Sequence, residues 1–219
     1  MVTVTVTSCT GAITSKTVTV NVPNNISTYV PYIVNGMVMY NDFGETQLAP
    51  VLCDASGGTA AVSVVANPDN SKMPNRSTNV LKYTKTANQW ANAFLRLPLS
   101  RRFDLTNQST FKVLVYGTAG DVVLLKLENT DWGGNAWQSG VEANYTIQKS
   151  NTWEIATYNF KGVANNGAAG ASFAADVTVG PVAMDFYNVV RIMYKAGEGA
   201  GSYTFYLDDL SGPGVEGLK

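Results

Sequence analysis

The chain contains no histidine, and its 219 residues include only 14% charged side chains and two cysteines. Without histidine there is no Ser-His-Asp triad, no Cys-His pair, no histidine-ligated catalytic zinc and no imidazole acid or base. Any enzymatic chemistry would therefore depend on carboxylate, lysine or tyrosine side chains. Cys9 and Cys53 match no metal-ligand spacing, so they form one disulfide or remain two separate thiols. Separate thiols are favoured, because the two residues fall in different predicted domains.

An excess of charge of one sign and long apolar runs are also missing. The 15 basic and 16 acidic residues nearly cancel and no basic cluster is visible, which argues against nucleic acid as a partner. No apolar run is long enough for a transmembrane helix, so we expect no membrane partner. The 45% hydrophobic content supplies the core of one large domain or slightly more. Low charge with abundant Thr, Asn, Ser, Gly and Tyr is typical of secreted all-β proteins, so we expect an extracellular protein with an uncharged or weakly charged ligand.

The amino-terminal segment 1–23 alternates Val and Thr on either side of a Ser-Cys-Thr-Gly-Ala turn, which predicts a β-hairpin. An isolated hairpin is marginal in water, so it packs on the following domain, pairs with another copy, or is the remnant of a missing domain. Segment 24–37 is predicted to be a linker. No signal peptide precedes Val2, so we interpret the chain as a fragment of a larger secreted protein.

From residue 38 onward, short apolar or alternating runs recur between turn clusters, and nothing longer than a turn has helical periodicity. The candidate strands are 37–40, 61–65, 80–84, 91–97, 110–116, 122–128, 141–147, 153–159, 189–194 and 203–207. About ten strands at this spacing predict an all-β fold, an antiparallel β-sandwich or jelly roll. This domain is expected to occupy residues 38–213, with a tail at 214–219. The Gly- and Ala-rich stretch 162–175 is predicted to be a surface loop.

Acidic residues stand at both ends of the predicted sandwich. The first strand leads into Asp42 and Glu45, and the last leads into Asp208 and Asp209. If the terminal strands lie side by side, these carboxylates meet, and meeting carboxylates need a cation or protons to offset their repulsion. We therefore predict a structural calcium ion (Ca²⁺) held by Asp42, Glu45 and Asp209. The alternative is that Asp208 and Asp209 only begin a turn after an apolar strand.

An ordered set of sequence features runs through most of this predicted domain. In order, these are Asn67-Pro68, Asn75-Arg76-Ser77, Gln89-Trp90, the strands 110–116 and 122–128, Asn151-Thr152-Trp153-Glu154, and Phe205 to Leu210. The set resembles noncatalytic carbohydrate-binding modules of the galactose-binding-like β-sandwich type, attached to secreted enzymes of polysaccharide-degrading bacteria. The hairpin resembles the end of an immunoglobulin-like module. One departure is Gly44, inserted where such modules place Glu directly after Phe.

The resemblance implies a jelly roll of two sheets, a structural calcium ion near the joined termini, and a sugar site on the concave sheet or its edge loops. It also implies that the module brings an attached catalytic domain of a glycoside hydrolase to its polysaccharide. The ligand class that we expect is a neutral β-linked glucan or xylan, bound without catalysis.

The tryptophans are the first candidates for sugar contacts, because pyranose rings stack their apolar faces on aromatic rings while their hydroxyls bind polar side chains. Trp132 and Trp137 lie in a segment rich in Gly, Asn and Asp, where burial is hard to arrange, so we predict both as ligand contacts, Trp132 foremost. The alternative for Trp137 is a lid on the sandwich edge. Trp90 is either a rim platform or a core anchor, and Trp153 is expected in the core.

Polar candidates follow from the period of two along the strand 122–128. Val123, Leu125 and Leu127 share one apolar face, which is expected to be the core face. Lys126 and Glu128 therefore share the opposite face, and neighbouring strands are expected to extend it with Glu142, Asn144, Arg191 and Met193. An ordinary solvated face explains the charges equally well. The resemblance favours a binding face, in which Lys126, Glu128, Glu142 and Arg191 contact the ligand.

Two other classes of function compete with a binding module. Glu128 and Glu142 are candidates for the carboxylate pair of a glycoside hydrolase. Lys126, Arg191 and Tyr194 are candidates for charge neutralisation and proton abstraction in a polysaccharide lyase. A purely structural or adhesive module needs no site, and it would leave Trp132 and Trp137 buried.

Overall fold

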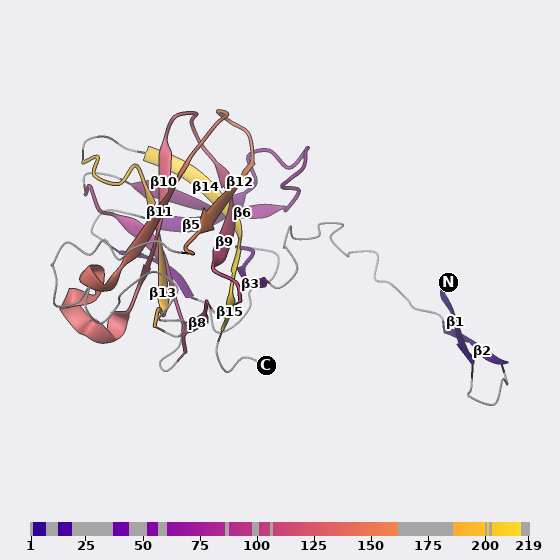
Figure 1. Cartoon of the computed structure of the whole chain (residues 1–219). Helices are drawn as coiled ribbons and strands as arrows, with labels where there is room; N and C mark the ends of the chain where they lie inside the picture. The colour runs from indigo at the N-terminus through magenta and orange to yellow at the C-terminus, as the bar shows by residue number, and fades with distance from the viewer. Residues whose placement is uncertain are drawn as a thin grey trace. The chain divides into compact units, whose positions relative to one another are not determined.

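The computed structural model describes residues 2–7, 13–18, 37–43, 52–56, 61–85, 88–97, 101–105, 107–161, 186–199, 201 and 203–215. The chain separates into two compact units, Met1–Val30 and Pro31–Lys219. In the part of the chain that the structure describes, no helix has the length and apolar character needed to cross a membrane. Figure 1 labels the strands used below.

The first unit contains a two-stranded antiparallel hairpin. Strands β1 (Val2–Thr7) and β2 (Ile13–Val18) pair with Val4 opposite Lys16, as the Val and Thr alternation predicts. Cys9 and the packing of the hairpin's side chains lie outside the described residues. The origin of the hairpin in an immunoglobulin-like module therefore stays a prediction.

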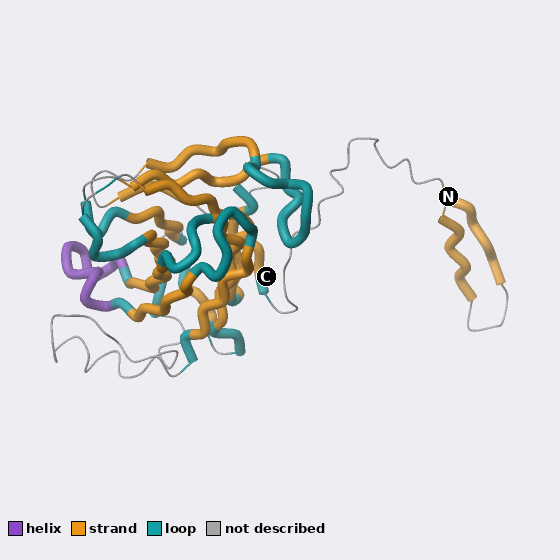
Figure 2. Tube along the Cα trace, turned by 90° about the horizontal axis from the view of Figure 1, so that it is seen from above, coloured by secondary structure: helices purple, strands orange, loops and turns teal. Residues whose placement is uncertain are grey.

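The second unit is an all-β antiparallel sandwich, as predicted from the sequence. The first sheet has the order β11-β10-β13-β7-β4 and is built from β4 (Leu52–Ser56), β7 (Asn92–Arg96), β10 (Val122–Glu128), β11 (Val141–Thr146) and β13 (Val189–Tyr194). The second sheet has the order β12-β9-β14-β6-β5, with β3 also paired to β14. Its strands are β3 (Val38–Asn41), β5 (Ala61–Ala66), β6 (Asn79–Lys85), β9 (Thr110–Tyr116), β12 (Glu154–Asn159) and β14 (Tyr203–Gly212). Figure 2 shows the strands of the two layers in orange.

The core lies between these two sheets. Val123, Leu125 and Leu127 are buried on one face of β10, so the predicted core face is confirmed. Across the core, Tyr194 of the first sheet stacks on Phe205 of the second, with ring centroids 4.3 Å apart and planes inclined by 13°. Offset-stacked aromatic pairs of this kind stabilise a core beyond the area that they bury.

Every strand expected from the sequence is present, although its ends differ by a few residues. Strands β4, β8 (Phe103–Asp104) and β15 (Gly214–Val215) were not predicted. The last two are only two residues long and pair with each other, which leaves no pattern of alternation to detect. Strand β15 falls in the segment expected to be a tail, and it pairs with β8 apart from the two main sheets.

The terminal strands of the sandwich lie side by side, as predicted. Strand β3 pairs with β14, with Asn41 opposite Leu210 and Met39 opposite Ser211, and the register shifts between Leu210 and Ser211. Gly212 is required at this junction, because an added Cβ would lie 2.6 Å from a ring carbon of Phe111. Asp208 and Asp209 lie inside β14, which continues to Gly212, and do not follow its end as expected. The pairing places the end of β3, next to Asp42, beside this part of β14.

One helical segment was not predicted. The segment η1 (Thr130–Ser139) is a 3-10 helix between β10 and β11, and it breaks at Gly133, where φ is 58° and ψ is −129°. Its amino terminus is capped by Asn129, whose side chain accepts a hydrogen bond from the backbone nitrogen of Asp131 at 2.9 Å. Figures 1 and 2 show this segment at one end of the sandwich. The segment depends on an N-cap and a glycine kink, and it lacks the apolar periodicity by which a longer helix is recognised in a sequence.

Candidate functional site

A row of polar residues crosses the outward face of the first sheet. The register places Glu142 opposite Lys126, Lys126 opposite Arg191, and Arg191 opposite Phe94. Directly opposed residues in antiparallel strands share a face, so all of these residues point away from the core. The predicted common face of Lys126, Arg191 and Glu142 is therefore confirmed by the register, whereas their contact with a ligand stays a prediction.

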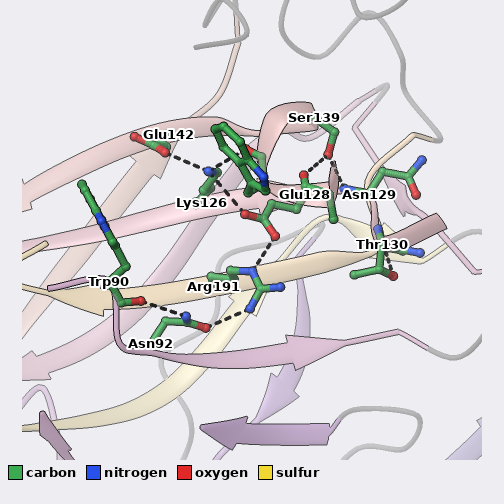
Figure 3. Close-up of polar contacts among 12 residues, drawn as sticks. Trp90, Asn92, Lys126, Glu128, Asn129, Thr130, Ser139, Glu142 and Arg191 are labelled. Carbon is green, nitrogen blue, oxygen red and sulfur yellow. Dashed lines mark hydrogen bonds and ion pairs between the residues drawn. The ribbon is translucent and has the colours of Figure 1, made fainter. Parts of the chain in front are cut away.

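The charges in this row are paired with one another (Figure 3). The Nζ atom of Lys126 lies 3.3 Å from Oε1 of Glu128 and 3.2 Å from Oε1 of Glu142. Arg191 donates from Nε to Oε2 of Glu128 at 2.5 Å and from Nη1 to Oδ1 of Asn92 at 3.0 Å. Because cations and anions alternate, the face has little excess charge. Such a surface suits a neutral ligand better than a highly charged one.

Lys126 and Glu128 are buried although they face outward. Lys126 is 7% exposed and Glu128 is 2% exposed. The end of η1 covers Lys126, because an added Cβ on Gly140 would lie 2.2 Å from Cε of Lys126. A buried, ion-paired side chain offers little surface to a sugar hydroxyl. The geometry therefore favours a supporting role for these two residues and leaves direct contact to more exposed neighbours.

Two tryptophans are exposed beside this row. Trp90 is 54% exposed and Trp137 is 46% exposed. Trp90 is therefore a surface residue and no core anchor, and Trp137 does not fold back as a buried lid. A purely structural module was expected to bury Trp137, so its exposure argues against that class of function.

Trp132 and Trp153 have different surroundings. Trp132 is only partly exposed, packs against the main core, and lies edge-on to Phe186 with ring centroids 5.5 Å apart. The expectation that burial is hard to arrange in this segment is therefore wrong for Trp132. Trp153 is buried as predicted, and its indole nitrogen donates to Oδ1 of Asn67 at 3.0 Å. The burial of Trp132 could not be predicted from the sequence, because its partner Phe186 is distant along the chain.

The turn that carries Trp90 is held by backbone and side-chain hydrogen bonds. The Trp90 nitrogen donates to Oδ1 of Asn88 at 2.8 Å, and the Trp90 carbonyl oxygen accepts from Nδ2 of Asn92 at 3.1 Å. Beneath the turn lies the buried ammonium of Lys85, which donates to the carbonyl oxygen of Gln89 at 3.0 Å. Burial lowers the pKa of Lys85 below its usual value. The exposed indole thus projects from a fixed backbone.

The segment that carries Trp137 is anchored in the same way. Ser139 accepts from the Asn129 nitrogen at 2.8 Å and donates to the Ala136 carbonyl oxygen at 2.6 Å. The carbonyl oxygen of Trp137 accepts from Nζ of Lys126 at 2.9 Å. Asp131, near the start of η1, pairs with Arg102. Both exposed tryptophans are therefore positioned before any ligand binds.

The residues proposed for a polysaccharide lyase are not assembled on one face. Tyr194 faces the core, where it stacks on Phe205, and its hydroxyl donates to Asp121. Burial, helped by Asp121, raises the pKa of Tyr194 well above its usual value. Tyr194 therefore lies on the opposite face from Lys126 and Arg191, and the predicted lyase set is wrong. Glu128 and Glu142, the candidate glycosidase pair, share the outward face and are both ion-paired with Lys126, and a catalytic role for them stays a prediction.

The acidic residues at the joined termini partly fit a calcium site. Asp42 follows the end of β3, and Asp209 lies inside β14 beside Leu210, which pairs with Asn41. Both carboxylates are buried, and oxygen ligands are the ones that calcium takes. Glu45 lies outside the described residues. Within the described ranges, no group of three or more Asp, Glu, Cys or His side chains is arranged to hold a metal ion. The other ligands would have to be backbone oxygens, water or Glu45, so the ion stays a prediction.

Asp208, which precedes Asp209 inside β14, has a structural role of its own. Its Oδ2 atom accepts from Nδ2 of Asn75 at 2.8 Å and from the Ser77 hydroxyl, and its Oδ1 atom accepts from the Asp209 nitrogen at 3.0 Å. Burial raises the pKa of Asp208 to about 7, and the charge of Asp42 acts in the same direction. A cation at this place would offset that repulsion.

No protein-family model matches the chain, and no curated protein is similar to it in sequence. Among solved structures, it is similar to the family 11 carbohydrate-binding module of the cellulosomal cellulase Lic26A-Cel5E of Clostridium thermocellum. The identity is 15%, the TM-score is 0.49, and the match covers 82% of this chain and 95% of that one. The family 11 module from the same organism in complex with a β-1,3-1,4-mixed-linked tetrasaccharide has 16% identity, a TM-score of 0.48, and coverage of 82% and 96%.

A family 29 carbohydrate-binding module variant complexed with cellulohexaose is also similar. Its identity is 10% and its TM-score is 0.46, with 80% of this chain and 89% of that chain covered. These likenesses are distant, so the ligand of this chain has to be inferred from its own residues.

Proposed function

We propose that this chain is a noncatalytic polysaccharide-binding module whose ligand is a neutral β-linked glucan or xylan. The observation that carries the proposal is the joint exposure of Trp90 and Trp137 on fixed backbone beside one polar sheet face. Exposed large aromatic side chains are costly to hydrate and gain most from an apolar partner. A pyranose ring provides such a partner on one face and hydroxyl groups around its edge.

Polar residues near the tryptophans supply partners for those hydroxyl groups. Glu142 keeps 30% of its side chain exposed and Asn144 is exposed on the same strand. Arg191 is more exposed than Glu128, with which it pairs. Since planar polar side chains bind hydroxyl pairs, Glu142 and Asn144 are the first candidates for direct contact and Arg191 is the next.

The charge pairing favours a neutral polymer over a polyuronate. Each cation of the row already has a carboxylate partner within 3.3 Å. An anionic polymer would have to displace those carboxylates, which are held partly out of water, and breaking such pairs is unfavourable. A neutral polymer leaves the pairs intact. In the wider setting, we propose that the module is secreted, is stabilised by a structural calcium ion and directs an attached catalytic domain to its substrate.

The proposal is tested by affinity electrophoresis of the purified chain in gels that contain mixed-linkage β-glucan, xyloglucan, xylan, mannan or polygalacturonate. We expect retardation by at least one neutral β-glucan or xylan and none by polygalacturonate. The same mixtures are assayed for new reducing ends and for unsaturated products, and we expect neither. Free migration in every neutral polymer would contradict binding, and turnover would contradict the noncatalytic assignment.

A further inference from the structure

The two exposed tryptophans are joined by an unbroken series of polar contacts across three strands of the first sheet. The carbonyl oxygen of Trp90 accepts from Nδ2 of Asn92 at 3.1 Å, and Oδ1 of Asn92 accepts from Nη1 of Arg191 at 3.0 Å. Nε of Arg191 donates to Oε2 of Glu128 at 2.5 Å, and Oε1 of Glu128 lies 3.3 Å from Nζ of Lys126. The same Nζ donates to the carbonyl oxygen of Trp137 at 2.9 Å. Figure 3 shows the part from Trp90 to Lys126 as dashed lines across the strands. We call Asn92, Arg191, Glu128 and Lys126 the polar bridge.

Stability alone does not account for the polar bridge. Taking charged groups out of water is expensive, and well-packed apolar residues in place of a buried ion pair are often neutral or stabilising. Lys126 and Glu128 are nevertheless almost fully buried on a face that points away from the core. What a buried ion pair supplies is a defined geometry, because each donor has to meet its acceptor. Here the chain of contacts ends at the backbone carbonyl oxygens of both tryptophans.

The side chains around the polar bridge hold it in place. Phe94 lies beneath two guanidinium groups, with Cζ of Arg191 5.2 Å and Cζ of Arg96 5.6 Å from its ring centroid. Glu142 gives Lys126 a second carboxylate partner. Gly140 allows the backbone to approach Lys126 more closely than any side chain would permit. Arg191 and Lys126 are thus fixed from both sides.

We propose that the polar bridge sets the spacing between Trp90 and Trp137, and thereby the length of polysaccharide that the module selects. This inference rests on the proposed function. Asn92, Glu128 and Lys126 are positioning residues, since they act on the ligand through the two indoles, whereas Arg191 is also a candidate for direct contact. A ligand long enough to cover both indoles gains from their fixed separation, because the second contact becomes intramolecular once the first has formed. A ligand that covers only one indole gains no affinity from the fixed separation.

The inference is tested with Glu128→Gln, which keeps the shape of the central residue and removes its charge. Isothermal titration is carried out with an oligosaccharide series, from disaccharide to hexasaccharide, of the best polymer in the panel. We expect the affinity for the longest member to fall by about tenfold or more, while the affinity for the shortest member that binds stays within about twofold. The ratio of long to short affinity is the readout, because general damage to the fold would lower both.

Gly140→Ala is a second variant that leaves every member of the polar bridge in the sequence. Its Cβ would displace Cε of Lys126, so it should give the same length-dependent loss, and it decides the matter if Glu128→Gln does not fold. The matched control is Glu154→Gln in the second sheet, whose carboxylate also accepts hydrogen bonds, from Tyr145 and from the Lys149 backbone. We expect no change in its length dependence.

The outcomes separate the inference from the proposed function. If the wild type binds no polysaccharide, both are overturned. If the wild type binds and both variants keep its preference for long ligands, or lose affinity for short and long ligands equally, only the polar bridge is overturned. A loss that appears for long ligands alone, in folded variants with near-normal melting temperatures, is the result that we expect.

Discussion

Lys85 donates a hydrogen bond from its buried ammonium group to the backbone carbonyl oxygen of Gln89, 3.0 Å away and one residue before Trp90. The same ammonium donates to the carbonyl oxygens of Tyr194 at 3.1 Å and Lys195 at 2.6 Å. A single cation therefore ties the Trp90 turn to the end of β13. A lysine ammonium has three N–H donors, and here all three have an acceptor. This explains how the charged group can be buried.

Lys85→Met tests this anchor. The substitution keeps most of the side-chain volume but removes the charged donor shared by three carbonyl oxygens, of which those of Gln89 and Lys195 keep a backbone donor. We therefore expect the free energy of unfolding to fall by roughly 1 to 3 kcal/mol. Polysaccharide affinity should fall as well, because the Trp90 turn loses its support. Chemical denaturation and titration measure the two effects. The control is Lys82→Met on the same strand. Because the Lys82 side chain is partly exposed, we expect its loss to change the free energy of unfolding by less than about 0.5 kcal/mol.

Trp132→Ala distinguishes packing from binding in the η1 segment. Since Trp132 contacts Phe186 and the main core, its loss should lower the free energy of unfolding by about 2 kcal/mol, less than for a fully buried tryptophan. Binding by the protein that remains folded should change little. Thermal melting measures the change in stability, and titration of the same preparation measures the change in affinity. Unchanged stability with abolished binding would restore Trp132 as the principal sugar contact.

The sequence predicted those parts of the site that depend on local periodicity. Alternation along β10 was enough to place Lys126 and Glu128 on one face, and the ordering of strands was enough to add Arg191 and Glu142. The pairing of the terminal strands was expected because it is usual in such a β-sandwich. Each of these inferences used only neighbouring positions and the fixed geometry of antiparallel strands.

Exposure could not be predicted, because it depends on residues that are distant along the chain. Phe186 buries part of Trp132, and the backbone at Gly140 buries Lys126. The cage around Lys85 is likewise formed by carbonyl groups from two separate turns. Nothing in the sequence near these residues signals such contacts. The exposure of Trp132 was therefore judged wrongly from the sequence, whereas the choice of the principal sugar contact among Trp90, Trp132 and Trp137 stays a prediction.

Calcium removal tests the site predicted where the end of β3 pairs with β14. An ion that binds only the folded chain stabilises it by mass action, by about 2.7 kcal/mol at a hundredfold excess over its dissociation constant. We expect EDTA to lower the melting temperature and calcium to restore it. Asp209→Asn should remove most of that response. A melting curve indifferent to exhaustive chelation, together with no metal by elemental analysis, would rule the ion out.

The stability of the calcium-free protein should depend on pH through Asp208. Burial raises the pKa of Asp208 to about 7, above the ordinary value of 3.8, so the folded state holds this proton more tightly than the unfolded chain does. Between those two values the unfolded chain binds fewer protons, and stability therefore falls as pH rises. Denaturation in EDTA from pH 5 to pH 7 should show a steeper fall for wild type than for Asp208→Asn. Parallel curves for the two proteins would contradict this assignment.

The measurement that tests the central claim most directly is titration of wild type, Trp90→Ala and Trp137→Ala with the best neutral polysaccharide. Both side chains are largely exposed, so neither variant should lose much stability. Loss of an aromatic contact at a binding hot spot costs about 2 kcal/mol or more, which corresponds to a fall in affinity of more than about tenfold. The account predicts that fall for each variant, with melting temperatures close to wild type. Wild-type affinity in both folded variants would contradict it and move the site away from this face of the first sheet.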